Sequence, residues 1–544
     1  MLKQTDAAQL LESAYREQLA ANPHEAVELG LHRFDGRLPD VSPRALQTEI
    51  ARLQRRRAEL GALAETALTQ TQLIERAVML STINRELFVL SELKAPWKNP
   101  MYYTSPLSLV SYVARPYASA AERARAIIAL TRATPAYLAQ ARANLAERMP
   151  RSWLSVALIQ TKGLQAFASD VPRALGDLPS ALADQLRQAL AGWREQLKEH
   201  AAFLERRQQL ATDDFAIGKA VFLRMLAETQ GVKVSLERLK DVAKRDLARN
   251  LEALTVACRQ IDPKKSVAEL IAVVSAERPS SAEQAYAIAT AQGARLRKLL
   301  VARNVVSIPS DDVVEVRATP AFMRWNSAFL DSAGPFETKA LPSFYYISPP
   351  DPSWPIAQQK QYLPATVDLL FVTAHELWPG HFLDHLHGKQ QHSAILKSFG
   401  GYARGEGWAH YAEELMLQHG LDGDPKVRIG QLLNALLRNV RFVAAIGLHT
   451  EGMTVEQAAE LFRTKAFTDE ASAMQQARRG TFDPMYLSYT LGKLMIVKLR
   501  DDYRKKLGAA YSERRFHDQF LGCCGSAPIS VTRRVLLGDD SPAL

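Results

Sequence analysis

The chain has 544 residues, of which 47% are hydrophobic and 23% charged, a composition typical of a soluble globular protein with a sizeable core. The formal net charge is +10, but the 68 basic residues are interleaved with 58 acidic ones, so a nucleic-acid partner is not expected. Three cysteines, two of them adjacent, exclude a disulfide framework and favour a reducing compartment.

The N-terminal segment is polar and amphipathic, without the apolar run of a signal peptide, and no apolar stretch is long enough to cross a membrane. We therefore expect no membrane partner and a cytoplasmic location for the chain as given, or a periplasmic or secreted one if a signal has been removed. Because no linker of Pro, Gly and Ser divides the chain, we predict one unit, 1–544, with an N-terminal helical lobe over 1–304 and a second lobe over 305–544.

From residue 7 to about residue 300, apolar residues recur every three or four positions, which predicts helices almost throughout. The clearest of these helices are predicted at 42–60, 70–93, 120–148, 180–209, 235–261 and 281–304. Two of them begin with N-cap signals, at Ser42 and Ser235. No fixed-period repeat is present, so a solenoid is not expected.

The pattern changes after residue 304. The segments VVSI, VVEVRAT and SFYYIS are short, rich in β-branched or aromatic residues, and bounded by prolines. They predict a small β-sheet just ahead of the next helix.

That helix carries the most informative stretch, PATVDLLFVTAHELWPGHFLDHLHG at 364–388. A histidine followed by a glutamate, with a second histidine further along a helix, can place two imidazoles on zinc beside a carboxylate base. The usual spacing is HExxH, whereas His375 and His381 are six positions apart, and a regular helix faces such residues away from each other.

Pro379 and Gly380 lie between these histidines and can allow a local bulge that turns His381 back toward the metal while Glu376 stays beside it. A rival pair is His381 with His385, which are four apart on a regular helix. For His385 itself, and for His387 and His410, we expect supporting or surface positions.

A catalytic zinc usually has three protein ligands, so a third must come from another segment. Glu406, in GEGWAHYAEEL, is the best candidate. It shares one face of the predicted helix with His410, Glu413 and Glu414.

Further helices are predicted at 427–449, 454–465, 469–478, 485–506 and 512–521. Arg438, Arg441 and His449 lie on the first of them, where such residues are most often surface charges.

The motifs HExxPGH, EGWAxYxE, a late YxxYxxGK and a final FHD together resemble the bacterial DUF885 family over nearly the whole chain. That family in turn resembles the gluzincin metallopeptidases. The resemblance implies a mainly α, two-lobed fold around a cleft, with a small β-sheet near the active site. It also implies a zinc site formed by His375, His381 and Glu406, with Glu376 as the general base.

The resemblance extends to a hydrogen-bond donor for the transition state. It implies a tyrosine or histidine from a helix after the third ligand. Tyr489 is our first choice, because its position before Gly492 matches the family-like tyrosine, and Tyr486 and His449 are the alternatives.

We therefore predict a zinc-dependent hydrolase, a metallopeptidase acting on peptides or small amides. An edge strand at 319–322 or 343–347 is expected to hold the substrate by its main chain. Two alternatives are a non-catalytic helical binding or scaffold protein with a structural or vestigial metal, and a zinc hydrolase of non-peptide amides or esters. Glu376 favours catalysis, since a structural zinc needs no adjacent base.

Overall fold

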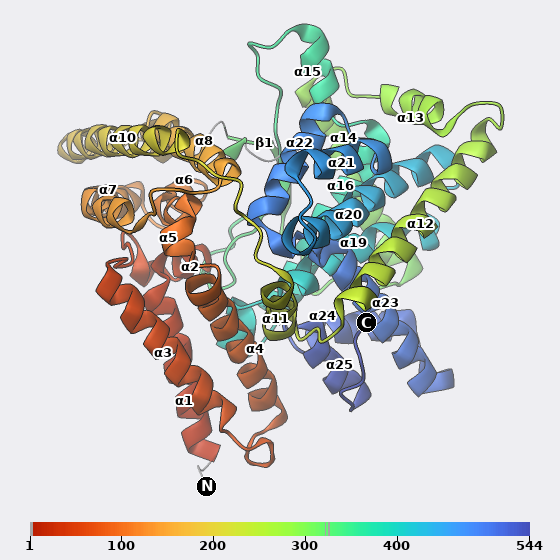
Figure 1. Ribbon diagram of the computed structural model, residues 1–544, viewed down its shortest axis with the longest axis horizontal. Coiled ribbons are helices and arrows are strands. Elements are labelled where there is room, and N and C mark those ends of the chain that lie inside the picture. Colours follow the sequence, from red (N-terminus) through yellow and green to blue (C-terminus); the bar gives the residue numbers. More distant parts are fainter. Residues whose placement is uncertain (1–3, 321–322, 325–326) are drawn as a thin grey trace. The chain divides into compact units, whose positions relative to one another are not determined.

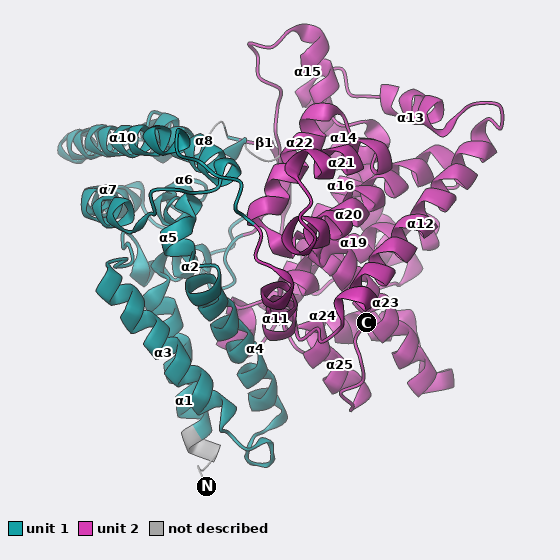
Figure 2. Ribbon diagram, in the orientation of Figure 1, with its two compact units in different colours: residues 1–215, 320–325, 333–342 teal, residues 216–319, 326–332, 343–544 magenta. Residues whose placement is uncertain are grey.

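The computed structural model of the protein describes residues 4–320, 323–324 and 327–544. Contacts divide the chain into two compact units, coloured separately in Figure 2. Unit 1 comprises Met1–Phe215, Pro320–Trp325 and Ala333–Pro342, and unit 2 comprises the remaining residues. The first boundary between the units falls after Phe215 and not at the predicted residue 304, because the helices between 216 and 304 pack on later helices of unit 2.

Unit 1 is a stack of helices, labelled in Figure 1. Its α-helices are α1 (Gln4–Ala21), α2 (Pro23–Glu28), α3 (Pro43–Gly61), α4 (Gln70–Leu87), α5 (Ala95–Lys98), α6 (Val110–Val113), α7 (Ala120–Asn144), α8 (Arg151–Phe167), α9 (Val171–Leu175) and α10 (Ser180–Gln208). The predicted start of α3 is confirmed, since the Ser42 hydroxyl accepts a hydrogen bond from the Ala45 N–H. The predicted helix at 70–93 ends earlier as an α-helix and continues as a π-helical turn, Phe88–Glu92.

His32 is the centre of a charged cluster within unit 1. Its two ring nitrogens lie 3.1 Å from carboxylate oxygens of Asp35 and Glu337, and its ring stacks on Tyr117 with 3.5 Å between centroids. Burial alone would lower the pKa of His32, but the two carboxylates outweigh it and raise that pKa to about 9. Gly30, with φ of +87°, lets the chain pass close to the Glu337 backbone. This cluster ties the 333–342 segment to the helices of unit 1.

Unit 2 contains the remaining helices and the sheet. Its α-helices are α11 (Lys219–Gln230), α12 (Leu236–Ile261), α13 (Val267–Ala276), α14 (Ala282–Arg303), α15 (Ile356–Tyr362), α16 (Thr366–Glu376), α17 (His381–Lys389), α18 (Ala394–Ser398), α19 (Tyr402–Gln418), α20 (Pro425–Thr450), α21 (Val455–Lys465), α22 (Glu470–Phe482), α23 (Ser488–Leu507), α24 (Glu513–Gly522) and α25 (Ile529–Leu537). Helix α20 lies at the centre and contacts α12, α16, α19, α21, α22 and α23. Most of its residues are buried, and they lie on all sides of the helix, whereas a surface helix buries only one face.

Two glycines bring α19 and α23 together. A Cβ on Gly407 would lie 2.5 Å from the Gly492 Cα, and one on Gly492 would lie 1.9 Å from the Ala403 carbonyl oxygen. Only glycine at both positions permits this approach. Glu406 on α19 and Tyr489 on α23 are therefore held in one region of the unit.

The sheet has three strands in the order β1 (Val314–Ala318), β3 (Ser343–Ile347), β2 (Ala328–Asp331), with β3 parallel to β1 and antiparallel to β2. The predicted small sheet is confirmed, but VVSI is not one of its strands and β2 was not foreseen. Segment 343–347 is the central strand, so it cannot offer the open edge expected of it. Residues 321–322 of the other expected edge lie outside the described residues, and Thr319 already pairs with Ile347 through a 3.0 Å hydrogen bond.

The mainly α fold with a small sheet is confirmed. Across residues 4–320, 323–324 and 327–544, none of the helices has both the length and the apolar character needed to span a bilayer.

Candidate metal centre

The chain breaks between the two histidines of the HExxPGH motif. Helix α16 ends at Glu376, the peptide between Trp378 and Pro379 is cis, and α17 begins at His381. The structure thus has two helices where the sequence predicted one bulged helix. A Cβ at Gly380 would lie 1.8 Å from the carbonyl oxygen of His375, so only glycine fits this return of the chain.

This break turns His381 back onto His375. The two rings are 4.8 Å apart between centroids and nearly perpendicular, at 87°. The indole N–H of Trp408 on α19 donates to the Pro379 carbonyl oxygen at 2.8 Å, which fixes the break against the helix that carries Glu406.

His375, His381 and Glu406 come together as predicted from the resemblance. Oε2 of Glu406 lies 3.2 Å from Nε2 of His375 and 3.4 Å from Nε2 of His381. Each residue offers one ligand atom, and these three atoms lie within 4.8 Å of one another. Among the described residues, no other set of three or more His, Cys, Asp or Glu side chains meets this condition.

The two separations from Glu406 fit the geometry of a tetrahedral zinc ion. Ligands about 2.0–2.1 Å from such an ion are separated from each other by roughly 3.3–3.4 Å. Both separations from Glu406 are close to that value. Two imidazole nitrogens and one carboxylate oxygen are also a donor set of catalytic zinc sites, which leave a fourth position open. The group could therefore hold such an ion.

Glu413 supports the first histidine from behind. It is fully buried, and its Oε1 lies 2.8 Å from Nδ1 of His375 and 2.9 Å from the Arg438 guanidinium. Burial alone would raise the pKa of Glu413, but Arg438 and the neighbouring histidines hold it well below its usual range. The ionised carboxylate accepts the Nδ1–H of His375 and so holds the ring with its Nε2 directed at Glu406.

His381 and Glu406 stabilise each other's charged forms. Burial alone would lower the pKa of His381, but the charge and hydrogen bond of Glu406 outweigh it and raise that pKa to about 9. Burial opposes ionisation of Glu406 as well, yet His381 and His375 together hold its pKa well below the usual value.

Glu376 lies beside this group without joining it. Only 9% of it is exposed, and its Oε2 accepts a 2.9 Å hydrogen bond from the Leu330 N–H of β2. Burial raises the pKa of the carboxyl, against a partial lowering by His381 and His375. The carboxylate is therefore more basic than a surface glutamate and is aimed by a backbone donor that the sequence did not reveal.

Of the three candidates for a transition-state donor, Tyr489 contacts the group through its ring. Its ring stacks on His375, with 6.1 Å between centroids and 20° between planes. Tyr486 is fully buried on the 3₁₀ turn η7 (Pro484–Leu487), where its hydroxyl lies against Gly480. His449 is also buried, and its Nε2 lies 2.7 Å from the Gly480 carbonyl oxygen.

The remaining motif histidines have separate roles. His387 lies 2.9 Å from the Ser307 carbonyl oxygen through its Nε2, and His410 is fully buried 3.4 Å from Glu413. Burial lowers the pKa of His410 to about 4. His385 is half-buried on α17 and does not belong to the three-residue group, so the rival couple with His381 is not the arrangement found.

Arg438 was expected to be a surface charge, but it is 6% exposed and paired with Glu413. No local pattern around it indicates this position. The signal that could have revealed it is the apolar character of α20 on several faces, which indicates a helix buried on all sides.

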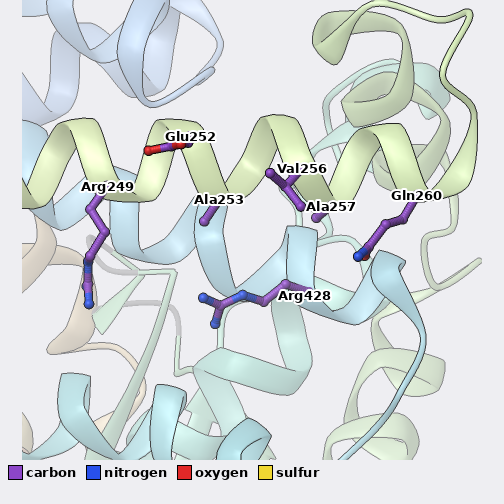
Figure 3. A pocket seen from close by; sticks show the side chains of 7 residues that line it. All are labelled: Arg249, Glu252, Ala253, Val256, Ala257, Gln260 and Arg428. Carbon is purple, nitrogen blue, oxygen red and sulfur yellow. The ribbon is translucent and has the colours of Figure 1, made fainter.

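Figure 3 shows a hollow of about 420 Å³ beside α12, lined by residues of that helix and by Arg428 of α20. None of the three predicted ligands lines it, and neither does Glu376. The chemistry indicated by the sequence therefore lies in another part of unit 2.

Comparisons with known proteins agree with the sequence motifs. The model of one family, described as "Bacterial protein of unknown function (DUF885)", matches residues 23–536. No curated protein matches the chain. A solved structure from Shewanella oneidensis, described as a "putative lipoprotein of unknown function", is 21% identical, with a TM-score of 0.79 over 98% of this chain and 99% of that one. One from Colwellia psychrerythraea, also described as a "putative lipoprotein", is 18% identical, with a TM-score of 0.82 over 99% of both chains.

Proposed function

Because the chain belongs to the DUF885 family, whose function is unknown, we propose from its site that it is a zinc-dependent hydrolase that cleaves peptide bonds. The observation that carries the proposal is the grouping of His375, His381 and Glu406 with Glu376 beside them and not among them. A purely structural zinc is usually enclosed by four protein ligands and has no use for an adjacent base. We also propose that the site works like that of the gluzincin metallopeptidases, which the motifs resemble.

His375 and His381 through Nε2, and Glu406 through Oε2, would hold the ion. When bound, zinc would supply Lewis acidity to the substrate carbonyl and to the attacking water. Glu413 keeps His375 in the required tautomer by accepting its Nδ1–H.

Glu376 would take the proton of the attacking water and later deliver it to the leaving amine. Its Oε2 is oriented by the Leu330 N–H, so Oε1 is the atom that would receive the proton. The raised pKa brings this carboxylate closer to neutral pH, where a base can both accept and release a proton.

The hydroxyl of Tyr489 would donate a hydrogen bond to the oxyanion that develops on the scissile carbonyl. Its ring is already stacked against His375, and the Arg479 guanidinium donates to its hydroxyl oxygen at 3.4 Å. His449 is less suited, since its Nε2 lies within hydrogen-bond distance of the Gly480 carbonyl oxygen.

An extended substrate would lie along β2, which replaces the two segments first expected for this role. β2 is at the edge of the described sheet, and its Leu330 N–H points to Glu376. Main-chain pairing with an edge strand is a known way to hold peptides without regard to side chains.

We also propose that the protein works outside the cytoplasm. The support is that the two solved structures with the same fold are described as putative lipoproteins. This follows the second of the two locations expected from the sequence, periplasmic or secreted, and not the cytoplasmic one. Fractionation of the native cells would test it.

The test of the function combines elemental analysis of the purified protein with digestion of a mixed peptide library. We expect zinc in stoichiometric amount and cleavage by the wild type. Glu376→Gln should keep the zinc and lose roughly 10²–10⁴-fold in turnover, the usual contribution of a general base. Near-wild-type turnover in this variant would refute the role of Glu376, and a zinc-loaded wild type that cleaves no peptide would refute the peptidase assignment.

A further inference from the structure

Three arginines surround the ring of Tyr489. The guanidinium carbons of Arg438 and Arg441, both on α20, lie 5.7 and 4.7 Å from the ring centroid. That of Arg479, on α22, lies 5.8 Å from it. We call these residues the arginine cluster. Arg438 also reaches His375 directly, with its Nη2 3.3 Å from Nδ1, whereas Arg441 and Arg479 approach that histidine through the ring of Tyr489, which stacks on it.

Two members of the arginine cluster have a carboxylate partner within the protein. Arg438 pairs with Glu413 at 2.9 Å, and Arg479 pairs with Asp483 at 3.1 Å. Arg441 has no such partner among the described residues. It is the surplus positive charge of the cluster.

Arg441 is 7% exposed, and its Nε–H donates to Gln476 Oε1 at 2.9 Å. Its two Nη groups make no hydrogen bond within the part of the chain that the structure describes. Neither Nη nitrogen is fully buried, so each has some surface that a ligand could reach. Burial and the charges of Arg479 and Arg438 lower the pKa of Arg441, which shows how unfavourable its charge is without a partner.

We propose that Arg441 binds the terminal carboxylate of a peptide substrate, which would make the protein a carboxypeptidase; this inference rests on the hydrolase function proposed above. A guanidinium presents two parallel N–H donors that match a planar carboxylate. An incoming carboxylate would therefore form an ion pair with Arg441, which has no carboxylate partner among the described residues.

The position of Arg441 favours the end of a peptide over a side chain along it. Arg441 is only 7% exposed, so its guanidinium leaves room for the end of a chain and not for a chain that passes over it. An extended peptide advances at most about 3.3–3.6 Å per residue. Since Arg441 and His375 both contact the ring of Tyr489, the bound carboxylate would lie one or two residues beyond the scissile bond.

The test uses the zinc-loaded full-length protein and short peptides of mixed sequence, each supplied as the free acid and as its C-terminal amide. Mass spectrometry of the products should show loss of one or two residues from the C-terminus of the acids and intact amides. A matched amide with Asp or Glu as its last residue distinguishes binding of a side-chain carboxylate from binding of the C-terminal carboxylate. Cleavage of that amide as fast as the acids would overturn the terminal assignment.

Two variants of Arg441 test the residue itself. Arg441→Met should lower kcat/KM on free acids by roughly 10²-fold or more, the usual loss when one partner of a buried charged pair is removed. Arg441→Lys, which keeps the charge and loses the paired donors, should have a kcat/KM on free acids between those of Arg441→Met and the wild type. Arg428→Met is the control on the same helix, and it should match the wild type.

The zinc content and the residual rate on amides should not change in Arg441→Met, whereas a merely structural role would alter both. If the wild type cleaves acids and amides equally well, the inference fails and the proposed hydrolase function stands. If the zinc-loaded wild type cleaves neither, the hydrolase function fails and the inference with it.

Discussion

Replacing Glu413 with glutamine tests whether the candidate metal centre depends on its supporting carboxylate. Glu413 is fully buried, and one of its oxygens serves both His375 at 2.8 Å and Arg438 at 2.9 Å. Glutamine keeps the size and one carbonyl oxygen but removes the negative charge. The Nδ1–H of His375 can still find an acceptor, but the acceptor is weaker and Arg438 becomes an unpaired buried charge.

Two losses of different kind should follow. Removing the carboxylate that supports a metal-bound histidine typically weakens metal affinity by about 10–100-fold. Leaving one partner of a buried ion pair unpaired costs about 3–5 kcal/mol of folding free energy. We expect the lower end of that range, because the glutamine oxygen still accepts a hydrogen bond from Arg438.

Zinc affinity is measured by competition with a chromophoric chelator, and stability by denaturant unfolding. Glu414→Gln is the matched control, since Glu414 is the next residue and pairs with Lys493 at 2.5 Å. It should lose stability with zinc affinity unchanged. Equal zinc affinity in Glu413→Gln and the wild type would show that the carboxylate does not support the ligand, and the interpretation of the site would have to change.

Three other outcomes are expected. Tyr489→Phe should lower kcat by roughly 10²–10³-fold with zinc content unchanged, as for loss of one oxyanion donor; a normal kcat in steady-state assays would remove this role. His381→Ala should lose most of its zinc by elemental analysis, whereas His385→Ala, on the same helix, should retain it, and the reverse pattern would favour the rival ligand couple. Because the pKa of His32 is raised to about 9, its stabilising contribution is complete below about pH 6.5 and disappears as the pH rises through about 9. In denaturant unfolding, the advantage of the wild type over His32→Gln should shrink across that interval, and a constant advantage would contradict the proposed charge pairing.

The sequence predicted much of the candidate site because its residues occur in short, specific motifs. His375, His381 and Glu406 could be named together, since two neighbouring segments carry them. The backbone between the histidines could not be predicted in detail. Helical periodicity does not distinguish a bulged helix from two helices separated by a turn at Trp378 and Pro379.

Long-range contacts explain what the sequence left hidden. Strand β2 is only four residues long, and it is defined by its pairing with β3 and not by its own composition. The Leu330 N–H that orients Glu376 comes from this strand, so no side-chain motif could have revealed it. Arg438 likewise looks like a surface charge until α20 is placed among its neighbouring helices.

Helix α19 holds the imidazole of His375 from both sides. Glu406 faces Nε2 at 3.2 Å, and Glu413, seven residues later on the same face, faces Nδ1 at 2.8 Å. The two contacts therefore share one register of α19 against α16, and a slip of one helical turn, about 5.4 Å, would break both together. Gly407, which admits α23, and Trp408, which bonds to the turn before α17, fix that register. The small and aromatic residues that follow Glu406 in the motif are thus needed to position the carboxylate, although neither can bind a metal.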